Sequence, residues 1–324
     1  MSVVTCQLCP KLCRIAPGQS GECRIRVNLD GRLRAVTYGR PCSLHVDPIE
    51  KKPLFHFLPG STIFSIATVG CNLHCTNCQN WEISQANPEE EPAYLCPPGK
   101  VVALAKEQQC LSVAYTYTDP VVFYEFALKT CESARAAGLR NVLVTAGYVN
   151  EDPWRRLCRV TDAANIDLKF FSDRLYREIC GATLQPVLDA LVIAKEEGVW
   201  VEVTNLVIPT LSDDLGDIRK LCRFIHDHLG PETPLHFSRF HPRFRLKSLP
   251  RTPTTTLMKA RDTALEVGLR YVYVGNVPGS GAESTHCPGC GTLLIPRVGY
   301  RLGKIRMTDG RCAECNQPIE GVWR

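Results

Sequence analysis

Apolar, β-branched runs alternate with amphipathic stretches along the middle of the chain, from about residue 60 to residue 280. The apolar runs predict strands at 62–69, 112–117, 141–145, 165–170, 200–208, 234–238 and 271–275. The stretches between them predict helices at 99–109, 121–137, 185–197, 214–228 and 254–267, most of which end at or near a glycine. This order predicts an α/β domain whose parallel sheet is covered by helices. Periodicity alone does not distinguish an open doubly wound sheet from a barrel.

Cysteine-rich segments flank this α/β region on both sides. A chain of 324 residues is long enough for one large domain with small appendages, or for two domains. We therefore expect three parts. Residues 1–45 form an N-terminal metal-binding module with four cysteine ligands, residues 46–280 form the α/β domain, and residues 281–324 form a C-terminal module that also has four cysteine ligands.

The first module contains Cys6, Cys9, Cys13 and Cys23, spaced C-x2-C-x3-C-x9-C. So short a segment buries little apolar core, and a metal cross-link would account for its order. Four thiolates suit zinc and an auxiliary iron–sulfur cluster equally well. The alternative is a set of reduced thiols packed on the main domain.

The third module contains two C-x2-C pairs, Cys287 with Cys290 and Cys312 with Cys315. Their separation is close to the zinc-ribbon pattern, so the module is expected to hold structural zinc or a rubredoxin-like single iron. A closed site of four thiolates stabilises a fold without reacting, and no catalytic role is predicted here.

Composition narrows the setting of the protein. Eighteen cysteines, most of them in short spaced motifs, indicate metal sites in a reducing compartment rather than a disulfide framework. Residues 1–14 lack the pattern of a signal peptide, and no apolar run reaches about 18 residues, so a cytoplasmic protein without a membrane span is expected. A net charge of +5 without a basic, aromatic-interleaved stripe argues against nucleic acid as a partner.

The loop after the first predicted strand carries Cys71, Cys75 and Cys78 at C-x3-C-x2-C spacing. Three thiolates can hold three irons of a 4Fe–4S cluster and leave the fourth iron open, whereas electron-transfer clusters usually have four cysteine ligands. A zinc knuckle or free buried thiols are the alternatives. No fourth ligand lies nearby at usual zinc spacing, which favours the cluster.

This spacing resembles that of the radical S-adenosylmethionine (SAM) enzymes, in which SAM binds the fourth iron. The stretch at 47–54, Asp-Pro-Ile-Glu-Lys-Lys-Pro-Leu, together with residues 71–81, is similar to the pyruvate formate-lyase activating enzyme-like group. Within that group it most resembles the AmmeMemoRadiSam-system enzymes. The resemblance implies a partial (β/α)6, TIM-like barrel. Asn77 departs from it, because many relatives carry an aromatic residue there.

The resemblance also implies which residues contact SAM, and it places them where predicted strands end. Asp119 stands in for a glutamate that meets the SAM amino group, although Asp119-Pro120 would also suit a simple turn. Lys169 and Asp167 share one side of a strand, where the lysine would hold the methionine carboxylate or form a structural ion pair. The implied SAM contacts are Asn80, Thr118, Asp119, Thr145, Gly147, Asp167, Lys169 and His241.

The implied function is reductive cleavage of SAM to methionine and a 5′-deoxyadenosyl radical, which abstracts hydrogen from an unknown substrate. The implied partners are a one-electron donor such as flavodoxin or ferredoxin, and proteins of the AMMECR or Memo type. Three alternatives remain: an activase for a glycyl-radical enzyme, a non-catalytic iron–sulfur or zinc electron-transfer or binding protein, and a nucleic-acid-modifying enzyme.

Overall fold

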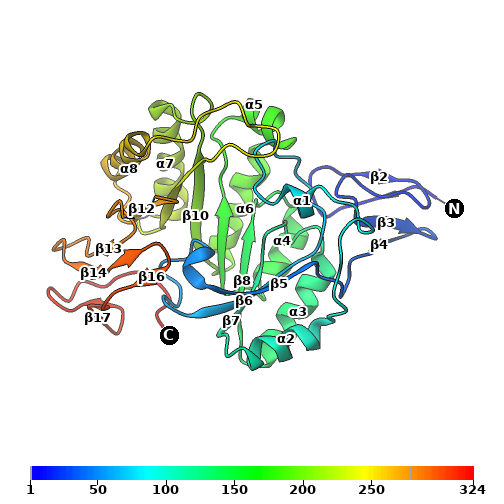
Figure 1. Cartoon of the computed structure of the whole chain (residues 1–324), viewed down its shortest axis with the longest axis horizontal. Coiled ribbons are helices and arrows are strands. Elements are labelled where there is room, and N and C mark those ends of the chain that lie inside the picture. Colours follow the sequence, from blue (N-terminus) through cyan, green and yellow to red (C-terminus); the bar gives the residue numbers. More distant parts are fainter. Residues whose placement is uncertain (1, 278) are drawn as a thin grey trace.

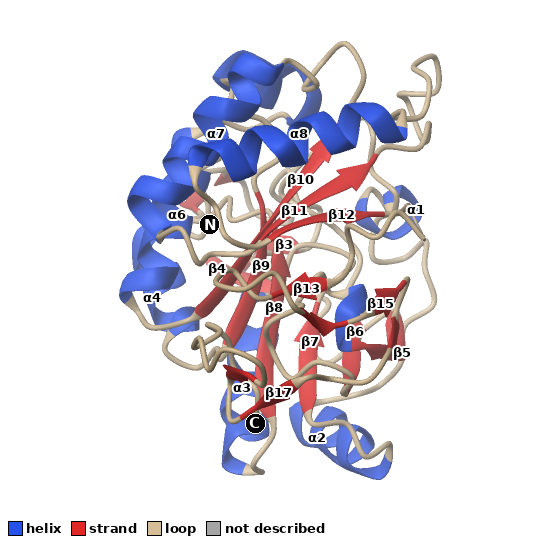
Figure 2. Cartoon of the chain, turned by 90° about the vertical axis from the view of Figure 1, so that its left-hand side faces the viewer, coloured by secondary structure: helices blue, strands red, loops and turns tan. Residues whose placement is uncertain are grey.

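A curved sheet of eight strands forms the centre of the computed structural model, which describes residues 2–277 and 279–324 (Figures 1 and 2). The strand order is β12-β11-β10-β9-β8-β7-β6-β5. All neighbours from β6 to β12 are parallel, and β5 is antiparallel to β6. The strands are β5 (Ser43–Pro48), β6 (Thr62–Ala67), β7 (Ser112–Tyr115), β8 (Arg140–Thr145), β9 (Ala163–Asp167), β10 (Trp200–Val207), β11 (Leu235–Arg239) and β12 (Val272–Gly275).

Helices connect the parallel strands and lie on the outer side of the sheet (Figure 2). They are α2 (Pro98–Glu107), α3 (Tyr124–Ala136), α4 (Glu151–Cys158), α6 (Gln185–Glu196), α7 (Leu215–Leu229) and α8 (Thr254–Val267). Shorter helical segments are η1 (Ile49–Lys51), α1 (Trp81–Ser84), α5 (Asp173–Leu175) and η2 (Tyr176–Cys180). The described chain thus has six consecutive β–α units and one further parallel strand. The predicted parallel α/β domain is confirmed.

Apart from the short segments η1, α1, α5 and η2, two elements of the central domain were not predicted. Strand β5 extends the sheet by one antiparallel strand, and it crosses the predicted boundary between residues 45 and 46. Helix α4 has only 8 residues, which is shorter than the stretch over which helical periodicity is recognised in a sequence. The division into three parts stays a prediction.

The N-terminal segment packs directly on the central domain. It contains two small antiparallel pairs, β1 (Val4–Thr5) with β2 (Arg14–Ile15), and β3 (Arg26–Leu29) with β4 (Arg32–Ala35). Cys23 and Ile25 belong to the same hydrophobic core as the barrel strands. The buried guanidinium of Arg26 forms a bidentate ion pair with Glu125 of α3, at 2.7 and 2.9 Å. These contacts attach the segment to the barrel.

The C-terminal segment lies at the open side of the barrel. Among the described residues, β5 and β12 are the two edges of the sheet and do not pair with each other. Tyr271 and Tyr273 near β12 pack with Phe55 and with apolar residues of the C-terminal segment. Leu58 and His56 exchange backbone hydrogen bonds of 2.7 Å with Val322. The segment therefore bridges the gap between the edges.

Short antiparallel pairs make up the C-terminal segment: β13 (Thr285–His286) with β14 (Leu293–Ile295), β15 (Arg297–Val298) with β16 (Arg301–Leu302), and β17 (Met307–Thr308) with β18 (Arg311–Cys312). Figure 1 shows the two small segments at opposite ends of the long axis, with the barrel between them. None of the helices in the described chain is long and apolar enough to cross a membrane.

Candidate active site

A cavity of about 440 Å³ lies at the carboxyl ends of the parallel strands. In parallel βα barrels this end carries the functional groups, and the volume lies in the range of small-molecule sites. Each strand from β6 to β12 contributes lining residues from its end or its following loop. They include Cys71, Cys75, Cys78, Asn80, Tyr117, Thr118, Asp119, Thr145, Ala146, Asp167, Lys169, Thr204, Leu206, His236, Ser238, Gly275 and Asn276.

The loop with the three central cysteines is held by η2, a single π-helical turn. The backbone N–H of His74 donates to the carbonyl of Cys180 at 2.8 Å, and that of Thr76 donates to Ile179 at 2.9 Å. π-Helical turns often occur at functional sites. Gly181, at φ 61°, ends this turn in the left-handed region that glycine adopts readily. The loop is thus fixed in place by backbone hydrogen bonds.

Cys71, Cys75 and Cys78 line the cavity but do not surround one common point. Among the described residues, only the four C-terminal cysteines bring three or more ligand atoms within 4.8 Å of one another. The three central sulfurs are therefore too far apart for a single ion, which argues against a zinc knuckle. Three thiolates on the lining of one cavity could each bind a different iron of a cluster.

The metal-free thiols are protonated at neutral pH. Burial, with the nearby Asp119 carboxylate, raises the pKa of Cys71 well above its usual value. Interaction with the Cys180 thiol, together with burial, does the same to the pKa of Cys75. Because a metal binds the thiolate, loading of this site must release protons.

Asp119 joins the end of β7 to the end of β8. Its carboxylate accepts hydrogen bonds from the backbone N–H of Val121 at 3.0 Å and of Ala146 at 2.9 Å, and from the Thr145 hydroxyl at 3.0 Å. Burial raises the pKa of Asp119 despite these donors. The carboxylate lines the cavity, but its oxygens already have protein partners.

Lys169 and Asp167 form an ion pair of 2.7 Å at the end of β9. Asn205 on β10 holds this corner, because its amide donates to the carbonyls of Leu168 and Lys169 at 2.8 and 3.2 Å. Burial alone would lower the pKa of Lys169, but the Asp167 carboxylate outweighs it and raises that pKa. The site therefore presents a firmly protonated ammonium beside the central cysteines.

The other predicted SAM contacts lie in different surroundings. Asn80 lines the cavity and donates to the Tyr117 carbonyl at 2.8 Å, and Thr118 donates to the carbonyl of Thr68 at 2.8 Å. Gly147 is buried behind the cavity wall, where its N–H donates to the Thr145 hydroxyl at 3.0 Å. His241 is exposed and lies outside the cavity lining. The structure thus brings together all of the predicted contacts except Gly147 and His241.

A buried polar cluster on one wall of the cavity escaped the sequence analysis. The Lys52 ammonium donates to Asp47 of β5 at 2.7 Å and lies 4.4 Å from the centre of the Tyr117 ring. The Tyr117 hydroxyl and the Ser65 hydroxyl donate to the same carboxylate. Tyr117 has φ 63°, a left-handed conformation that is rare for an aromatic residue and is typical of functional sites.

This cluster has shifted pKa values. Burial lowers the pKa of Lys52 to about 8, although Asp47 opposes the shift. Burial would raise the pKa of Asp47, but Lys51, Lys52 and Tyr117 outweigh it and hold that pKa well below its usual range. The only sequence signal was the 47–54 stretch itself, which carried the resemblance without suggesting a role for any side chain.

His236 on β11 forms the floor of the cavity with Glu202 behind it. Its Nε2 lies 2.7 Å from the Glu202 carboxylate, which also accepts from the backbone N–H groups of Phe55 and His56 at 2.9 and 2.8 Å. Glu202 is completely buried, yet His236 and its other partners keep its pKa lowered against the effect of burial. This network ties the floor to the segment after β5.

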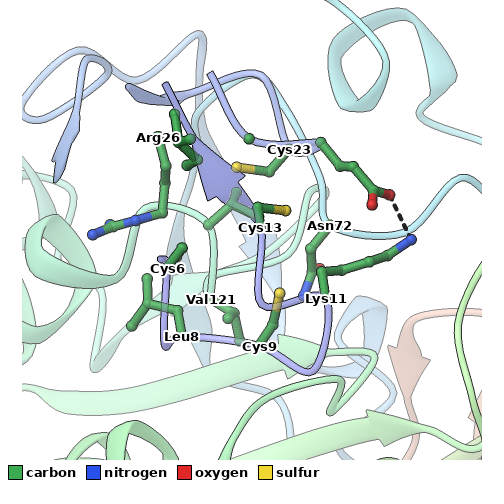
Figure 3. A pocket seen from close by; sticks show the side chains of 13 residues that line it. Cys6, Leu8, Cys9, Lys11, Cys13, Cys23, Arg26, Asn72 and Val121 are labelled. Carbon is green, nitrogen blue, oxygen red and sulfur yellow. Dashed lines mark hydrogen bonds and ion pairs between the residues drawn. The ribbon is translucent and has the colours of Figure 1, made fainter. Parts of the chain in front are cut away.

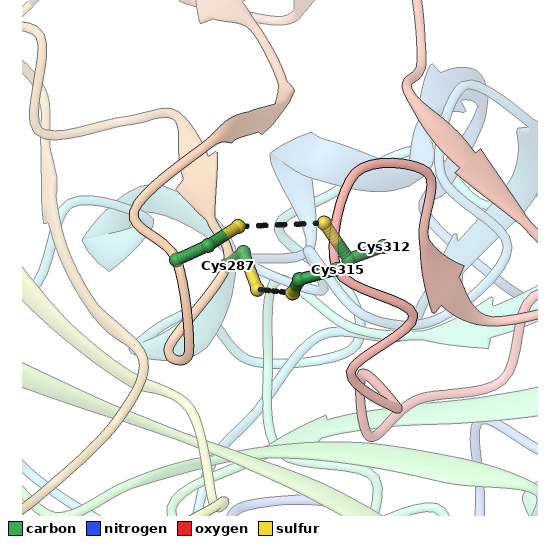
Figure 4. Close-up of side chains that lie close together, drawn as sticks. Cys287, Cys312 and Cys315 are labelled. Atoms are coloured by element: carbon green, nitrogen blue, oxygen red, sulfur yellow. Dashed lines mark hydrogen bonds between the residues drawn. The ribbon is translucent and has the colours of Figure 1, made fainter.

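The four C-terminal cysteines meet at one point, as Figure 4 shows for the close pairs. The Sγ atoms of Cys287 and Cys315 lie 3.5 Å apart, and those of Cys290 and Cys312 lie 3.7 Å apart. Tetrahedral Zn–S bonds of about 2.3 Å place two sulfurs about 3.8 Å apart. The residues therefore fit a single metal ion, whose identity stays a prediction.

The C-terminal segment also reaches the central cavity. Gly299 and Tyr300, in the turn between β15 and β16, belong to its lining. The sequence analysis gave this segment a structural role alone, and the position of this turn adds a contribution to the mouth of the cavity.

Known proteins resemble this chain in sequence and in fold. The model of the Radical SAM superfamily matches residues 65–225, a range that contains the three central cysteines and Lys169. An uncharacterized protein of Methanocaldococcus jannaschii is 47% identical over 321 residues, which cover 98% of this chain and 96% of that protein.

More distant similarities reach characterised proteins. The pyruvate formate-lyase-activating enzyme of Clostridium pasteurianum is 24% identical over 161 residues, which cover 48% of this chain and 66% of that enzyme. The crystal structure of Streptococcus suis SuiB bound to S-adenosylmethionine has a similar fold, with a TM-score of 0.53 and 11% identity. That match covers 70% of this chain and 53% of SuiB.

Proposed function

Because this chain belongs to the radical SAM superfamily, we propose that Cys71, Cys75 and Cys78 bind a 4Fe–4S cluster and that SAM occupies the adjoining cavity. When bound, the reduced cluster supplies the electron that cleaves SAM into methionine and a 5′-deoxyadenosyl radical, which takes hydrogen from the substrate. The observation that carries this proposal is the presence of all three thiols on the lining of one cavity of about 440 Å³, a volume in the range of small-molecule sites.

The side chains around the cavity suggest how SAM would be oriented. The Lys169 ammonium would pair with the methionine carboxylate, and Asp167 would keep that ammonium in position. Asn80 and Thr118 present polar groups from neighbouring loops, and Asp119 fixes the loops after β7 and β8. Thr145, Gly147 and His241 complete the set of proposed contacts, with His241 needing a movement of its loop to reach the cavity.

Loss of one cluster ligand tests the proposal. We expect the Cys75→Ala variant, reconstituted without oxygen, to form no 5′-deoxyadenosine from SAM with dithionite as reductant. Cys222→Ala is the matched control, because Cys222 is a buried cysteine of α7 outside the three cysteine motifs. Cleavage by Cys75→Ala at the rate of the control would refute the proposal.

A second candidate is activation of a glycyl-radical enzyme. Two relatives support it, the C. pasteurianum enzyme and the (2S)-3-sulfopropanediol dehydratase activating enzyme of Klebsiella oxytoca, which is 25% identical over 115 residues. This candidate requires a protein substrate, and its product would be a glycyl radical visible by electron paramagnetic resonance (EPR) on the partner. Membership of the radical SAM superfamily indicates that the chain is an enzyme. The alternative of a non-catalytic iron–sulfur or zinc protein is therefore less well supported.

Finer features of the resemblance are also part of the proposal. Residues 47–54 and the loop at 71–81 support a place among the AmmeMemoRadiSam-system enzymes, with AMMECR-type or Memo-type proteins as partners. Flavodoxin or ferredoxin would supply electrons. Zinc or a rubredoxin-like iron would occupy the C-terminal cysteines, whose geometry suits either.

A further inference from the structure

The four N-terminal cysteines line a second cavity, separate from the one that holds the central loop. Figure 3 shows the sulfur atoms of Cys9, Cys13 and Cys23 turned toward the same space, which Cys6 also borders. Buried apolar side chains, among them Ile15, Val121 and Val122, share the wall with the polar side chains of Lys11, Glu22, Arg26 and Asn72. Cysteines gathered around one cavity are positioned to bind a metal group.

The spacing of these sulfurs differs from that of the C-terminal site. Four thiolates around one zinc ion would stand about 3.8 Å apart, as the sulfurs of Cys287, Cys290, Cys312 and Cys315 nearly do. No three of the N-terminal cysteines, all of which are described, bring their sulfurs within 4.8 Å of one another. The same chain thus contains one set spaced for a single ion and one set spaced more widely. A 4Fe–4S cluster needs the wider spacing, because each thiolate binds its own iron.

The arrangement of the cysteines in the sequence points the same way. A zinc ribbon takes its ligands from two C-x2-C pairs, as in the C-terminal segment. Cys6, Cys9 and Cys13 instead lie within eight residues, and Cys23 follows at a distance. A run of three closely spaced cysteines with one remote partner is typical of iron–sulfur ligation.

This second cavity lies directly behind the central cysteine loop. Asn72, the neighbour of Cys71, belongs to its lining. A Cβ atom on Gly70 would lie 2.5 Å from the carbonyl oxygen of Cys23, so the two backbones are in close contact. Lys11 and His74 share the carboxylate of Glu22, at 2.6 and 3.3 Å. A group held by the N-terminal cysteines would therefore be separated from the central loop by little more than one layer of atoms.

We propose that Cys6, Cys9, Cys13 and Cys23 bind a second 4Fe–4S cluster that passes electrons to the cluster of the central loop. The relay role rests on the proposed function, whereas binding of the second cluster does not. A low-potential one-electron donor reduces the second cluster, which then returns to its oxidised state as the electron moves to the oxidised central cluster. No bond is formed or broken in the relay. Arg26 and Lys11 also line this cavity, and each is paired with a carboxylate, Arg26 with Glu125 and Lys11 with Glu22.

Metal and sulfide analysis of the central variant tests cluster binding. In Cys71→Ala/Cys75→Ala/Cys78→Ala, reconstituted without oxygen, we expect about four acid-labile sulfides per chain, against about eight in the unmodified protein. Acid-labile sulfide excludes a rubredoxin-like iron, which contains none. The N-terminal module is intact in this variant, and SAM chemistry plays no part in the measurement. A central variant without labile sulfide, or with two zinc ions per chain, would overturn the assignment.

A comparison of reductants tests the relay. In Cys9→Ser/Cys13→Ser, we expect the ratio of flavodoxin-driven to dithionite-driven SAM cleavage to fall at least tenfold, since dithionite is small enough to reduce the central cluster directly. An unchanged ratio would refute the relay. If this variant fails to fold, EPR of the unmodified, dithionite-reduced protein replaces it. The relay then requires two clusters whose signals broaden each other, and two signals without interaction would refute it.

Discussion

The buried ion pair between Lys52 and Asp47 on the wall of the cavity allows a quantitative prediction about the free energy of unfolding. Asp47 accepts from Lys52 at 2.7 Å and from Lys51 at 2.8 Å, but the two lysines differ in environment. The Lys52 side chain is 2% exposed, whereas that of Lys51 is 43% exposed. The same carboxylate thus forms one buried and one surface ion pair, which provides an internal control.

Three substitutions should give three distinct losses of stability. Asp47→Asn leaves the Lys52 ammonium buried without an anion, so we expect a loss of about 3–5 kcal/mol in the free energy of unfolding. Lys52→Met leaves Asp47 with Lys51, Ser65 and Tyr117, so a smaller loss of about 2–3 kcal/mol is expected. Lys51→Met removes a solvent-exposed partner and should cost less than about 1 kcal/mol.

Urea denaturation of anaerobically purified protein at pH 7, followed by circular dichroism, measures these losses. In Asp47→Asn/Lys52→Met the two losses should not add, and we expect a coupling free energy of about 2 kcal/mol. Additive losses would show that the two side chains act independently. Equal costs for Lys51→Met and Lys52→Met would show that burial does not set the strength of the pair.

Three further predictions concern other parts of the structure. Burial lowers the pKa of His56 to about 4, so the unfolded chain binds more protons than the folded chain between pH 6.5 and 4, and stability falls with falling pH. From pH 6.5 to 5, urea denaturation should show a loss of stability about 1.6 kcal/mol larger in the unmodified protein than in His56→Gln. Equal losses would contradict this. Gly70→Ala should lower the free energy of unfolding by at least about 3 kcal/mol, because the new Cβ would lie 2.5 Å from the Cys23 carbonyl oxygen. Gly138→Ala is the control, since Gly138 has φ 79° but no neighbour within 4 Å, and equal melting temperatures of the two variants would refute this prediction. Cys312→Ser should remove one metal ion per chain by elemental analysis while labile sulfide stays constant, and a fall in sulfide would contradict a single-ion site.

The sequence predicted the parts of the fold that depend on local pattern. The strands of the parallel sheet are rich in apolar residues, and most of the predicted helices end at or next to a glycine, so both could be located within a few residues. Strand β5 was not found because it is an edge strand that mixes polar and apolar residues, and its pairing with β6 is a tertiary property. Local patterns do not encode such long-range partners.

The candidate site was predicted in its central part and incompletely at its edges. The cysteine spacing located the cluster loop, and strand ends located Asp119, Asp167 and Lys169, because parallel strands end at one edge. Lys52 follows η1 in a charged stretch that predicts solvent exposure, and its burial arises only in the folded chain, where Asp47 of β5 and Tyr117 of the loop after β7 pack against it. The expectation for His241 came from resemblance alone, and the structure leaves that side chain in solvent.

The C-terminal segment bridges the gap between β5 and β12 and brings Gly299 and Tyr300 to the mouth of the cavity. This part of the cavity mouth therefore lies far along the sequence from Cys71, Cys75 and Cys78. A change in the length or sequence of this one hairpin would reshape the mouth of the cavity and leave the residues at the strand ends unchanged. The shape of the entrance and the residues at the base of the cavity can in this way vary independently within one polypeptide.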